Sequence, residues 1–247
     1  MKPALRFLVT AGNTREPIDS VRDWGNIFTG NTGFEIARAL ATAGEVDLLT
    51  SNRSHVAEAP AASIRATHFT THEALKDALS ALMGRVPYDA VFMTAAVADY
   101  KPQRVYEVVE RRPDGETPGV ETWRVRDAQA AKVKSAFAEM AVLGRRTEKL
   151  VDLFRTVWGH RGLLVKFKLE VGIGLGELLR VGDASRRASR ADYLVANTLE
   201  MVGGPGAGAF LLSDAGHEWL PRSDLPRRMV ELAIGAPAAA KPETERP

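Results

Sequence analysis

Residues 8–33, LVTAGNTREPIDSVRDWGNIFTGNTG, contain the residue types that point most directly to chemistry. We expect a buried strand that stops at Gly12, then a long loop rich in glycine, asparagine and threonine, then a helix that starts at Thr32–Gly33. A loop that leads into a helix N-terminus presents free backbone N–H groups and the positive end of the helix dipole. The loop is therefore a candidate phosphate or carboxylate site. The alternative, a polar loop closed by its own Asx turns, explains the composition but not the length.

The sequence AAVADYKP, residues 95–102, follows an apolar run and forms a second candidate loop. Small residues at a strand end let a ligand lie against the backbone. Asp99 can then serve as a ligand for magnesium or for a hydroxyl group, and Lys101 as a counter-charge. A lone aspartate here also suits a helix cap or an ion pair, so both interpretations stay open. In an open α/β sheet, ligands bind beyond the carboxyl ends of the strands, where both loops would lie.

Two glycine-rich segments follow. GIGLG, residues 172–176, resembles a shortened dinucleotide-binding fingerprint, but its spacing is wrong and a plain turn fits better. GGPGAG, residues 203–208, predicts either a mobile flap or a plain flexible connection. The five histidines are dispersed without metal-ligand spacing, and we expect structural or surface roles for all of them. No serine lies in a nucleophile elbow.

Strand signals alternate with amphipathic helix signals along the chain. This alternation predicts an α/β fold, a doubly wound, mostly parallel Rossmann-like sheet with helices on both faces. The expected strands span residues 6–10, 46–50, 64–69, 90–95, 163–169 and 193–196, with a closing hairpin at 210–213 and 218–220. The expected helices span residues 34–43, 71–83, 147–158, 177–189 and 225–234, with a candidate short helix within 51–63. Gly44 is expected as a C-cap, and Thr71 and Thr147 as N-caps.

The alternation breaks between residues 103 and 126. Residues 105–109 and 121–125 predict two short strands around the turn-rich RRPDGETPG. We expect this insertion to project from the sheet as a β-ribbon. The remaining chain, residues 1–235, is expected to form a single domain, and residues 236–247, rich in alanine, proline and charge, a disordered tail.

Composition excludes several functional classes. Of the 247 residues, 45% are hydrophobic and 26% charged, which is typical of a soluble globular protein. The absence of cysteine excludes disulfides, thiolate metal sites and a cysteine nucleophile. The net charge is +2, and the arginine pairs are interleaved with acids, so we expect no nucleic-acid partner. No apolar run approaches the roughly 20 residues that span a bilayer, so we expect no membrane association and a cytoplasmic location.

Several blocks of the sequence resemble the phosphopantothenate–cysteine ligase family, in bacteria usually the C-terminal half of a bifunctional flavoprotein. VTAGNTREPIDSVRDWGN closely resembles the family's opening VTAGxTREPIDxVRxxxN. TGNTG at residues 29–33 is similar to its SSGxxG, and AAVAD at 95–99 to its AAVAD. KVK at 132–134 looks like the start of its KIKK, FKLE at 167–170 like its strand-end FKLET, and Ala196–Asn197 like its late Ala–Asn. The blocks occur in the family's order over about residues 5–235.

The resemblance implies an enzyme that joins phosphopantothenate to cysteine in coenzyme A biosynthesis. The substrate carboxylate attacks the α-phosphate of CTP or ATP, an acyl-nucleotide and pyrophosphate form, and the cysteine amine then displaces the nucleotide. Mg²⁺ and a homodimer, whose subunits complete each other's site with a projecting β element, are further implications of the resemblance.

The resemblance also assigns residues. Asn26 would hold the substrate carboxylate and the acyl intermediate, Lys132 would neutralise charge on the triphosphate, and Asp99 would act near Mg²⁺. The implied substrate and phosphate contacts are Gly12, Thr14, Arg22, Thr29, Gly30 and Gly33. The implied nucleotide contacts are Ala95, Ala96, Val97, Ala98, Phe167 and Asn197.

Four departures keep other functions open. Asn31 stands where the family usually has a cation, and Ser135 replaces the last lysine of KIKK. The stretch between Asp99 and Lys132 is longer than in common bacterial members, and GGPGAGA replaces the late GFxSDxN. These differences suit a non-catalytic nucleotide-binding relative. A nicotinamide-dependent oxidoreductase is a third hypothesis, opposed by the lack of GxGxxG after the first strand and by the position of Asp47 inside the second strand.

Overall fold

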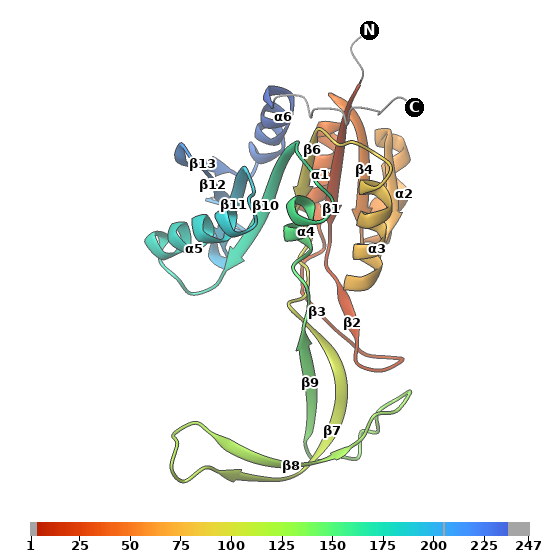
Figure 1. Cartoon of the computed structure of the whole chain (residues 1–247), viewed down its shortest axis with the longest axis vertical. Helices are drawn as coiled ribbons and strands as arrows, with labels where there is room; N and C mark the ends of the chain where they lie inside the picture. The colour runs from red at the N-terminus through yellow and green to blue at the C-terminus, as the bar shows by residue number, and fades with distance from the viewer. Residues whose placement is uncertain (1–3, 205, 237–247) are drawn as a thin grey trace, which may run out of the picture.

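The computed structural model describes residues 4–204 and 206–236 (Figure 1). A sheet flanked by helices forms the body of the molecule, and a narrow β arm projects from one end of it. The tail expected at residues 236–247 lies outside the described residues from residue 237 onwards.

The main sheet has eight strands in the order β13-β12-β11-β10-β6-β1-β4-β5. Strands β5, β4, β1, β6, β10 and β11 run parallel, and β12 and β13 add an antiparallel edge. Counted along the chain, the parallel strands follow the order 3-2-1-4-5-6 of a Rossmann sheet, so the direction of winding reverses between β1 and β6. The strand bounds are β1 Leu5–Ala11, β4 Gly44–Thr50, β5 Ile64–His68, β6 Ala90–Met93, β10 Leu163–Glu170, β11 Tyr193–Thr198, β12 Gly208–Ser213 and β13 Gly216–Pro221.

Both faces of the sheet are covered. Helices α1 (Asn31–Leu40), α2 (Arg53–Glu58) and α6 (Leu225–Gly235) lie on one face, and α3 (His72–Met83), α4 (Leu150–Thr156) and α5 (Leu175–Ala188) on the other. Alternate residues of each strand face opposite cores; Val9 packs in the α1 core and Leu8 in the α3 core. The central strands read as continuous apolar runs because both of their faces are buried. The predicted fold class is confirmed.

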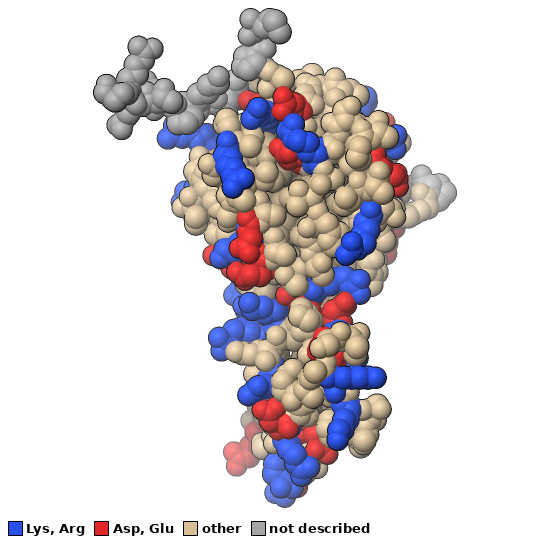
Figure 2. All heavy atoms as spheres, turned by 90° about the vertical axis from the view of Figure 1, so that its right-hand side faces the viewer, with Lys and Arg blue, Asp and Glu red and all other residues tan. Residues whose placement is uncertain are grey.

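The arm has three antiparallel strands, where the sequence indicated two. Strand β7 (Tyr100–Pro113) pairs along its outer half with β8 (Glu121–Asp127) and along its inner half with β9 (Met140–Arg146). Strand β9, MAVLGRR, was missed because its apolar run is only four residues long and is followed by one glycine and two arginines. Opposite charges face each other across β7 and β8, as in the Arg111–Glu121 ion pair at 2.8 Å. Acidic and basic side chains are interspersed on body and arm (Figure 2).

Several predicted boundaries are wrong. The first loop contains a small two-stranded sheet, β2 (Arg15–Pro17) and β3 (Asp23–Gly25). Helix α1 ends at Leu40, so Gly44 is the first residue of β4 rather than a C-cap. Helix α4 begins at Leu150, because the hydroxyl of Thr147 donates to the carbonyl of Ala98 at 2.6 Å instead of capping a helix. The N-cap at Thr71 is confirmed.

Candidate active site

The two candidate loops meet at the point where the sheet reverses its winding. Beyond β1 and β6, the backbones of Asn13 and Ala96 form a parallel bridge, and the N–H of Ala96 donates to the carbonyl of Gly12 at 2.8 Å. Thr14 is fully buried, and its hydroxyl accepts from the N–H of Ala98 at 2.8 Å. Thr14 therefore braces one loop against the other, as a support beneath the site.

The N-terminus of α1 is pressed against the end of β1. Gly30, the N-cap, has φ 82° and no side chain to satisfy the first turn. A Cβ atom on Gly30 would overlap the backbone of Gly12, so glycine is required by both conformation and space. In the described chain, the N–H groups of Asn31, Thr32 and Gly33 have no hydrogen-bond partner, and the first turn has no acidic residue. This helix end suits an anion.

A cleft of about 370 Å³ opens next to this helix end, across β1, β6, β10 and β11; we call it the switch-point cleft. The predicted contacts that line it are Gly12, Thr29, Gly30, Gly33, Ala96, Phe167 and Asn197. Two cations that sequence reasoning missed also line it. Lys168 forms an ion pair with Glu170 at 2.6 Å, and Arg222 donates to the carbonyl of Val202 at 3.1 Å. Arg222 follows the antiparallel edge strand β13, so no loop after a parallel strand indicated it.

Asn26 is exposed and does not line this cleft, but it is hydrogen-bonded to Ala96, which does. Its Nδ2 donates to the carbonyl of Ala96 at 3.2 Å, and its own carbonyl accepts from the side chain of Asn13. The amide of Asn26 is thus held directly over the carboxyl end of β6. The second N–H of Nδ2 and the side-chain oxygen Oδ1 are in a position to contact a ligand.

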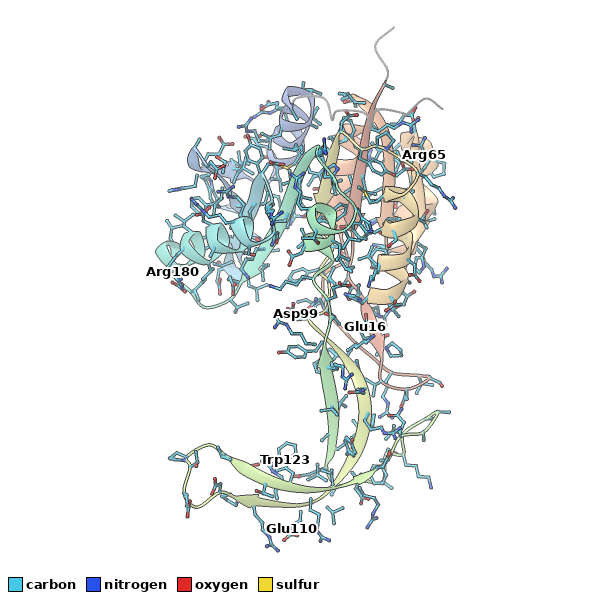
Figure 3. All side chains as sticks on the ribbon, in the orientation of Figure 1. Glu16, Arg65, Asp99, Glu110, Trp123 and Arg180 are labelled. Carbon is cyan, nitrogen blue, oxygen red and sulfur yellow. The ribbon has the colours of Figure 1, made fainter. Side chains whose placement is uncertain are left out.

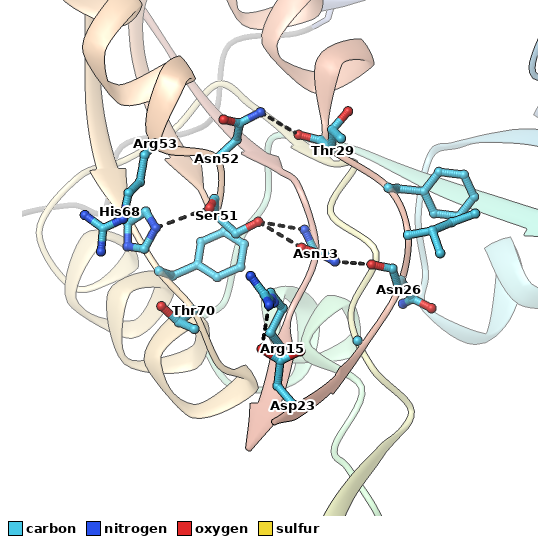
Figure 4. Close-up of a pocket in the computed structure, with 14 residues that line it drawn as sticks. Asn13, Arg15, Asp23, Asn26, Thr29, Ser51, Asn52, Arg53, His68 and Thr70 are labelled. Carbon is cyan, nitrogen blue, oxygen red and sulfur yellow. Dashed lines mark hydrogen bonds and ion pairs between the residues drawn. The ribbon is translucent and has the colours of Figure 1, made fainter. Parts of the chain in front are cut away.

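On its other side, Asn26 lines a second pocket, of about 740 Å³, over β1, β4 and β5 (Figure 4). Arg15, Arg53 and His68 bring basic groups to this pocket. Arg15 is paired with Asp23 at 2.7 Å, and Nε2 of His68 lies 3.2 Å from the carbonyl of Ser51. Sequence reasoning did not single out Arg53, and expected only a structural or surface role for His68. The strand-end rule alone could have found both residues, since β4 and β5 also end here.

The remaining residues of the AAVAD loop lie elsewhere. Ala95, Val97, Ala98 and Asp99 line a separate pocket of about 170 Å³ on the α4 side of the sheet, and Phe167 lines both this pocket and the switch-point cleft. Asp99 is exposed at the junction of body and arm (Figure 3).

Lys166 is buried at the wall of this pocket. Its amine donates to the hydroxyls of Ser185 and Ser189 at 3.0 and 2.7 Å and to the Ser185 carbonyl at 3.1 Å. Burial lowers the pKa of Lys166 to about 8. Because all three of its N–H groups have partners, this lysine fastens α5 to β10 and is not free to meet a ligand.

Lys132 is placed apart from these pockets. It is exposed on the segment between β8 and β9, as is Lys134. Arg22, in the turn between β2 and β3, donates to the carbonyl of Val133 at 2.8 Å. The structure therefore brings together the turn of Arg22 and the segment of Lys132.

Asn31 stands at the position where the ligase family usually has a cation, and its side-chain amide is hydrogen-bonded. Oδ1 of Asn31 lies 3.1 Å from Nε2 of His55, whose ring stacks on Phe34 with 4.4 Å between centroids. Burial lowers the pKa of His55. His55 is therefore neutral at pH 7 and supports Asn31 without adding charge.

No three metal-binding side chains converge anywhere in residues 4–204 and 206–236. A single exposed carboxylate such as Asp99 is nevertheless how a nucleotide-bound Mg²⁺ is often held, because phosphates and water fill the other positions. Within the same ranges, no helix is both long and apolar enough to cross a membrane.

Comparison with known proteins agrees with these features. Residues 4–118 match the family described as the DNA/pantothenate metabolism flavoprotein C-terminal domain. The coenzyme A biosynthesis bifunctional protein CoaBC of Mycobacterium bovis is 30% identical over 220 residues, which cover 89% of this chain and 46% of that protein. The chain thus spans about half the length of the curated relatives that it matches.

Two solved structures share the fold. The DNA/pantothenate metabolism flavoprotein of Streptococcus pneumoniae superposes with a TM-score of 0.72 at 24% identity, covering 92% of this chain and 97% of that one. A Cab2 mutant in complex with phosphopantothenate-cysteine gives a TM-score of 0.67 at 14% identity, covering 93% and 85%. These comparisons show that residues 4–118 are similar to the DNA/pantothenate metabolism flavoprotein C-terminal domain, and that most of the chain is similar to part of the bifunctional CoaBC protein.

Proposed function

We propose that this protein is a phosphopantothenate–cysteine ligase that activates its substrate with CTP or ATP. One observation carries the proposal: the switch-point cleft joins the open N-terminus of α1 to Ala96, Phe167 and Asn197, and the side chain of Asn26 is hydrogen-bonded to Ala96. The cleft is suited to a nucleotide because a helix end meets the phosphates while Phe167 and Val195 offer apolar surface to the base.

In the proposed reaction, a carboxylate oxygen of phosphopantothenate attacks the α-phosphorus of the nucleotide, and the bond to the β-phosphate bridging oxygen breaks. Pyrophosphate leaves and an acyl-nucleotide remains. The cysteine amine then attacks the acyl carbon, the nucleoside monophosphate leaves, and the amine loses a proton. No step needs a protein nucleophile, so catalysis depends on positioning and on charge stabilisation.

The residues divide this work. The free N–H groups of Asn31, Thr32 and Gly33 at the start of α1 would hold phosphate oxygens. The Asn26 amide donates to the reacting carboxylate and then to the acyl oxygen. Lys132, which the structure places apart from the cleft, would have to reach the bound triphosphate, where it would offset the charge that develops on pyrophosphate. Asp99 would hold Mg²⁺ together with substrate oxygens, and the ion when bound neutralises phosphate charge.

The arm suggests a second copy of the chain as a partner. Two large aromatic side chains are exposed on it: Tyr100, the first residue of β7, and Trp123, which lies far out on the arm (Figure 3). We propose a homodimer in which each arm reaches the neighbouring body, as the family resemblance implies.

Pyrophosphate release tests the proposed function. The protein is incubated with phosphopantothenate, cysteine and Mg²⁺ in two parallel assays, one with CTP and one with ATP. Release above background with either nucleotide supports the ligase and identifies the nucleotide. If nucleotide binds but neither assay yields pyrophosphate, the ligase proposal is wrong, and the alternative of a non-catalytic nucleotide-binding relative is supported.

A further inference from the structure

The side chain of Asp19 is fully buried, although it lies in a turn at the surface. Its Oδ1 accepts hydrogen bonds from the backbone N–H groups of Val21 and Arg22, both at 2.9 Å. This pattern is the Asx turn expected of a polar loop. It occupies one of the two carboxylate oxygens.

The second oxygen bonds to a segment that is distant in the sequence. Oδ2 accepts from the backbone N–H of Val133 at 3.0 Å and from Nε of Arg22 at 3.0 Å. The Arg22 guanidinium continues to the carbonyl of Val133 at 2.8 Å, and the N–H of Ser20 donates to the carbonyl of Ala131 at 2.8 Å. The residues on both sides of Lys132 are thus fixed to one turn.

Charge strengthens this arrangement. The guanidinium of Arg22, followed by the backbone N–H groups around the carboxylate, holds the pKa of Asp19 well below its usual range. Asp19 is therefore ionised at neutral pH, and its hydrogen bonds are charge-assisted. Residues 128–139 lie outside any helix or strand, so no regular backbone pairing positions Lys132 from within its own segment.

We propose that Asp19 is a positioning residue for nucleotide activation: one buried carboxylate orients Arg22 and fixes the segment that presents Lys132. The role of Lys132 at the triphosphate rests on the proposed function; the contacts of Asp19 do not. Asp19 itself touches no substrate. It acts by limiting how far two cations on irregular segments can move from a productive geometry.

Asp19→Asn tests the proposal. In this variant an amide NH₂ group replaces Oδ2. It cannot accept the hydrogen bonds of the Val133 N–H and the Arg22 guanidinium, because its own N–H groups face these donors. Hydrogen–deuterium exchange followed by mass spectrometry should show loss of protection in residues 128–134. The rate of pyrophosphate release should fall roughly 100-fold, the cost of a displacement of about 1 Å, while nucleotide affinity stays unchanged. Asp19→Glu, which keeps the charge, should recover part of the rate.

Asp127→Asn is the matched control, because Asp127 is an exposed carboxylate close to the same segment. It accepts from the N–H of Gln129 at 2.9 Å and pairs with Arg104 at 3.1 Å. This variant should behave as the parent protein in both measurements. Protection of β1 and β6 shows that each variant is folded.

Two results would overturn the proposal: unchanged exchange in residues 128–134 of folded Asp19→Asn, or lost protection without a loss of rate. If the parent protein releases no pyrophosphate, the proposed function fails. The exchange measurement then still decides whether Asp19 anchors the segment, so the two failures are distinguishable.

Discussion

The switch-point cleft and the segment between β8 and β9 are held in place by opposite means. The cleft is built from backbone: the glycines of α1 and β1 pack so closely that a single added Cβ atom would not fit. The segment is irregular and exposed, and the buried carboxylate of Asp19 fastens it to the turn between β2 and β3. The proposed nucleotide cleft is therefore held by backbone packing, whereas the position of Lys132 depends on side-chain hydrogen bonds.

This difference separates binding from chemistry. Changes in the cleft should affect folding and nucleotide affinity together, because the same close packing produces both. Changes in the segment should affect the rate and leave stability intact, because Lys132 and Lys134 are exposed. Substitutions in the two regions test this separation.

Lys132→Gln should produce the largest change in rate. Removal of one cation that meets developing charge costs on the order of 100-fold in catalysis. Lys134→Gln, two residues further on, is the matched control and should stay within about threefold of the parent, where a single surface charge acts weakly. Pyrophosphate release and thermal unfolding are measured for both. The reverse ranking would assign the role to Lys134, and equal rates would mean that neither lysine meets the triphosphate.

Gly30→Ala should destabilise the fold by about 2 kcal/mol, because an L-residue is strained at φ 82° and its Cβ would overlap Gly12. Nucleotide affinity should fall with stability. Gly176→Ala is the control: Gly176 is exposed in α5 with open space around it, so its substitution should change stability by less than about 1 kcal/mol. Urea unfolding and nucleotide titration give both quantities. A destabilised Gly30→Ala variant with normal nucleotide affinity would contradict the expectation that stability and affinity fall together.

Asn26→Asp should slow turnover of the acyl-nucleotide by about tenfold, since a donor that meets the acyl oxygen is replaced by a carboxylate. The carboxylate would also face the carbonyl of Ala96. Rapid-quench analysis should show the acyl-nucleotide accumulating while the first burst of pyrophosphate persists. Equal slowing of both half-reactions would place Asn26 at the phosphates rather than at the acyl group.

The smallest effect is a pH dependence of stability from His55. Burial lowers its folded pKa below the ordinary value of 6.5, so unfolding takes up a proton at low pH. Stability from this group is complete above pH 6.5 and falls as the pH decreases, by at most about 1.4 kcal/mol per pH unit. His160 shifts in the same direction through burial. His55→Gln should therefore flatten the profile of unfolding free energy only in part, and an unchanged profile would contradict the burial argument.

The sheet was predictable from the sequence because its strands carry local signals. The apolar runs of β6 and β10 and the amphipathic helices between strands are sufficient for a doubly wound fold. Strand β9 was not predictable, since MAVLGRR becomes a strand by pairing with β7 rather than through its own pattern. Thr147 does not cap α4 for a similar reason: its hydroxyl donates a hydrogen bond to the carbonyl of Ala98 in a distant loop.

The geometry of the candidate site was predictable where the backbone makes it. The glycines in the loop after β1 indicated the close approach of the chain to an open helix N-terminus, which the structure shows at Gly12, Gly30 and Gly33. Arg222 and the two oxygens of Asp19 were not predictable, because their partners lie far along the chain. The family resemblance implied a role for Lys132. Its position, however, is fixed by hydrogen bonds that join Asp19 and Arg22 to Val133, which are far apart in the sequence.

The outer end of the arm gives the molecule a convenient dividing line. Gly115 and Gly119 are exposed in the turn between β7 and β8, with nothing within 4 Å of an added Cβ at either position. Everything before this turn includes β1, β4, β5 and β6, and everything after it includes β10 to β13. A break here would leave two fragments that meet again through β6 with β10 and through β7 with β8 and β9. The arm tip is thus a rational place to split the chain into a complementation reporter, or to insert a fluorescent label without touching either half of the sheet.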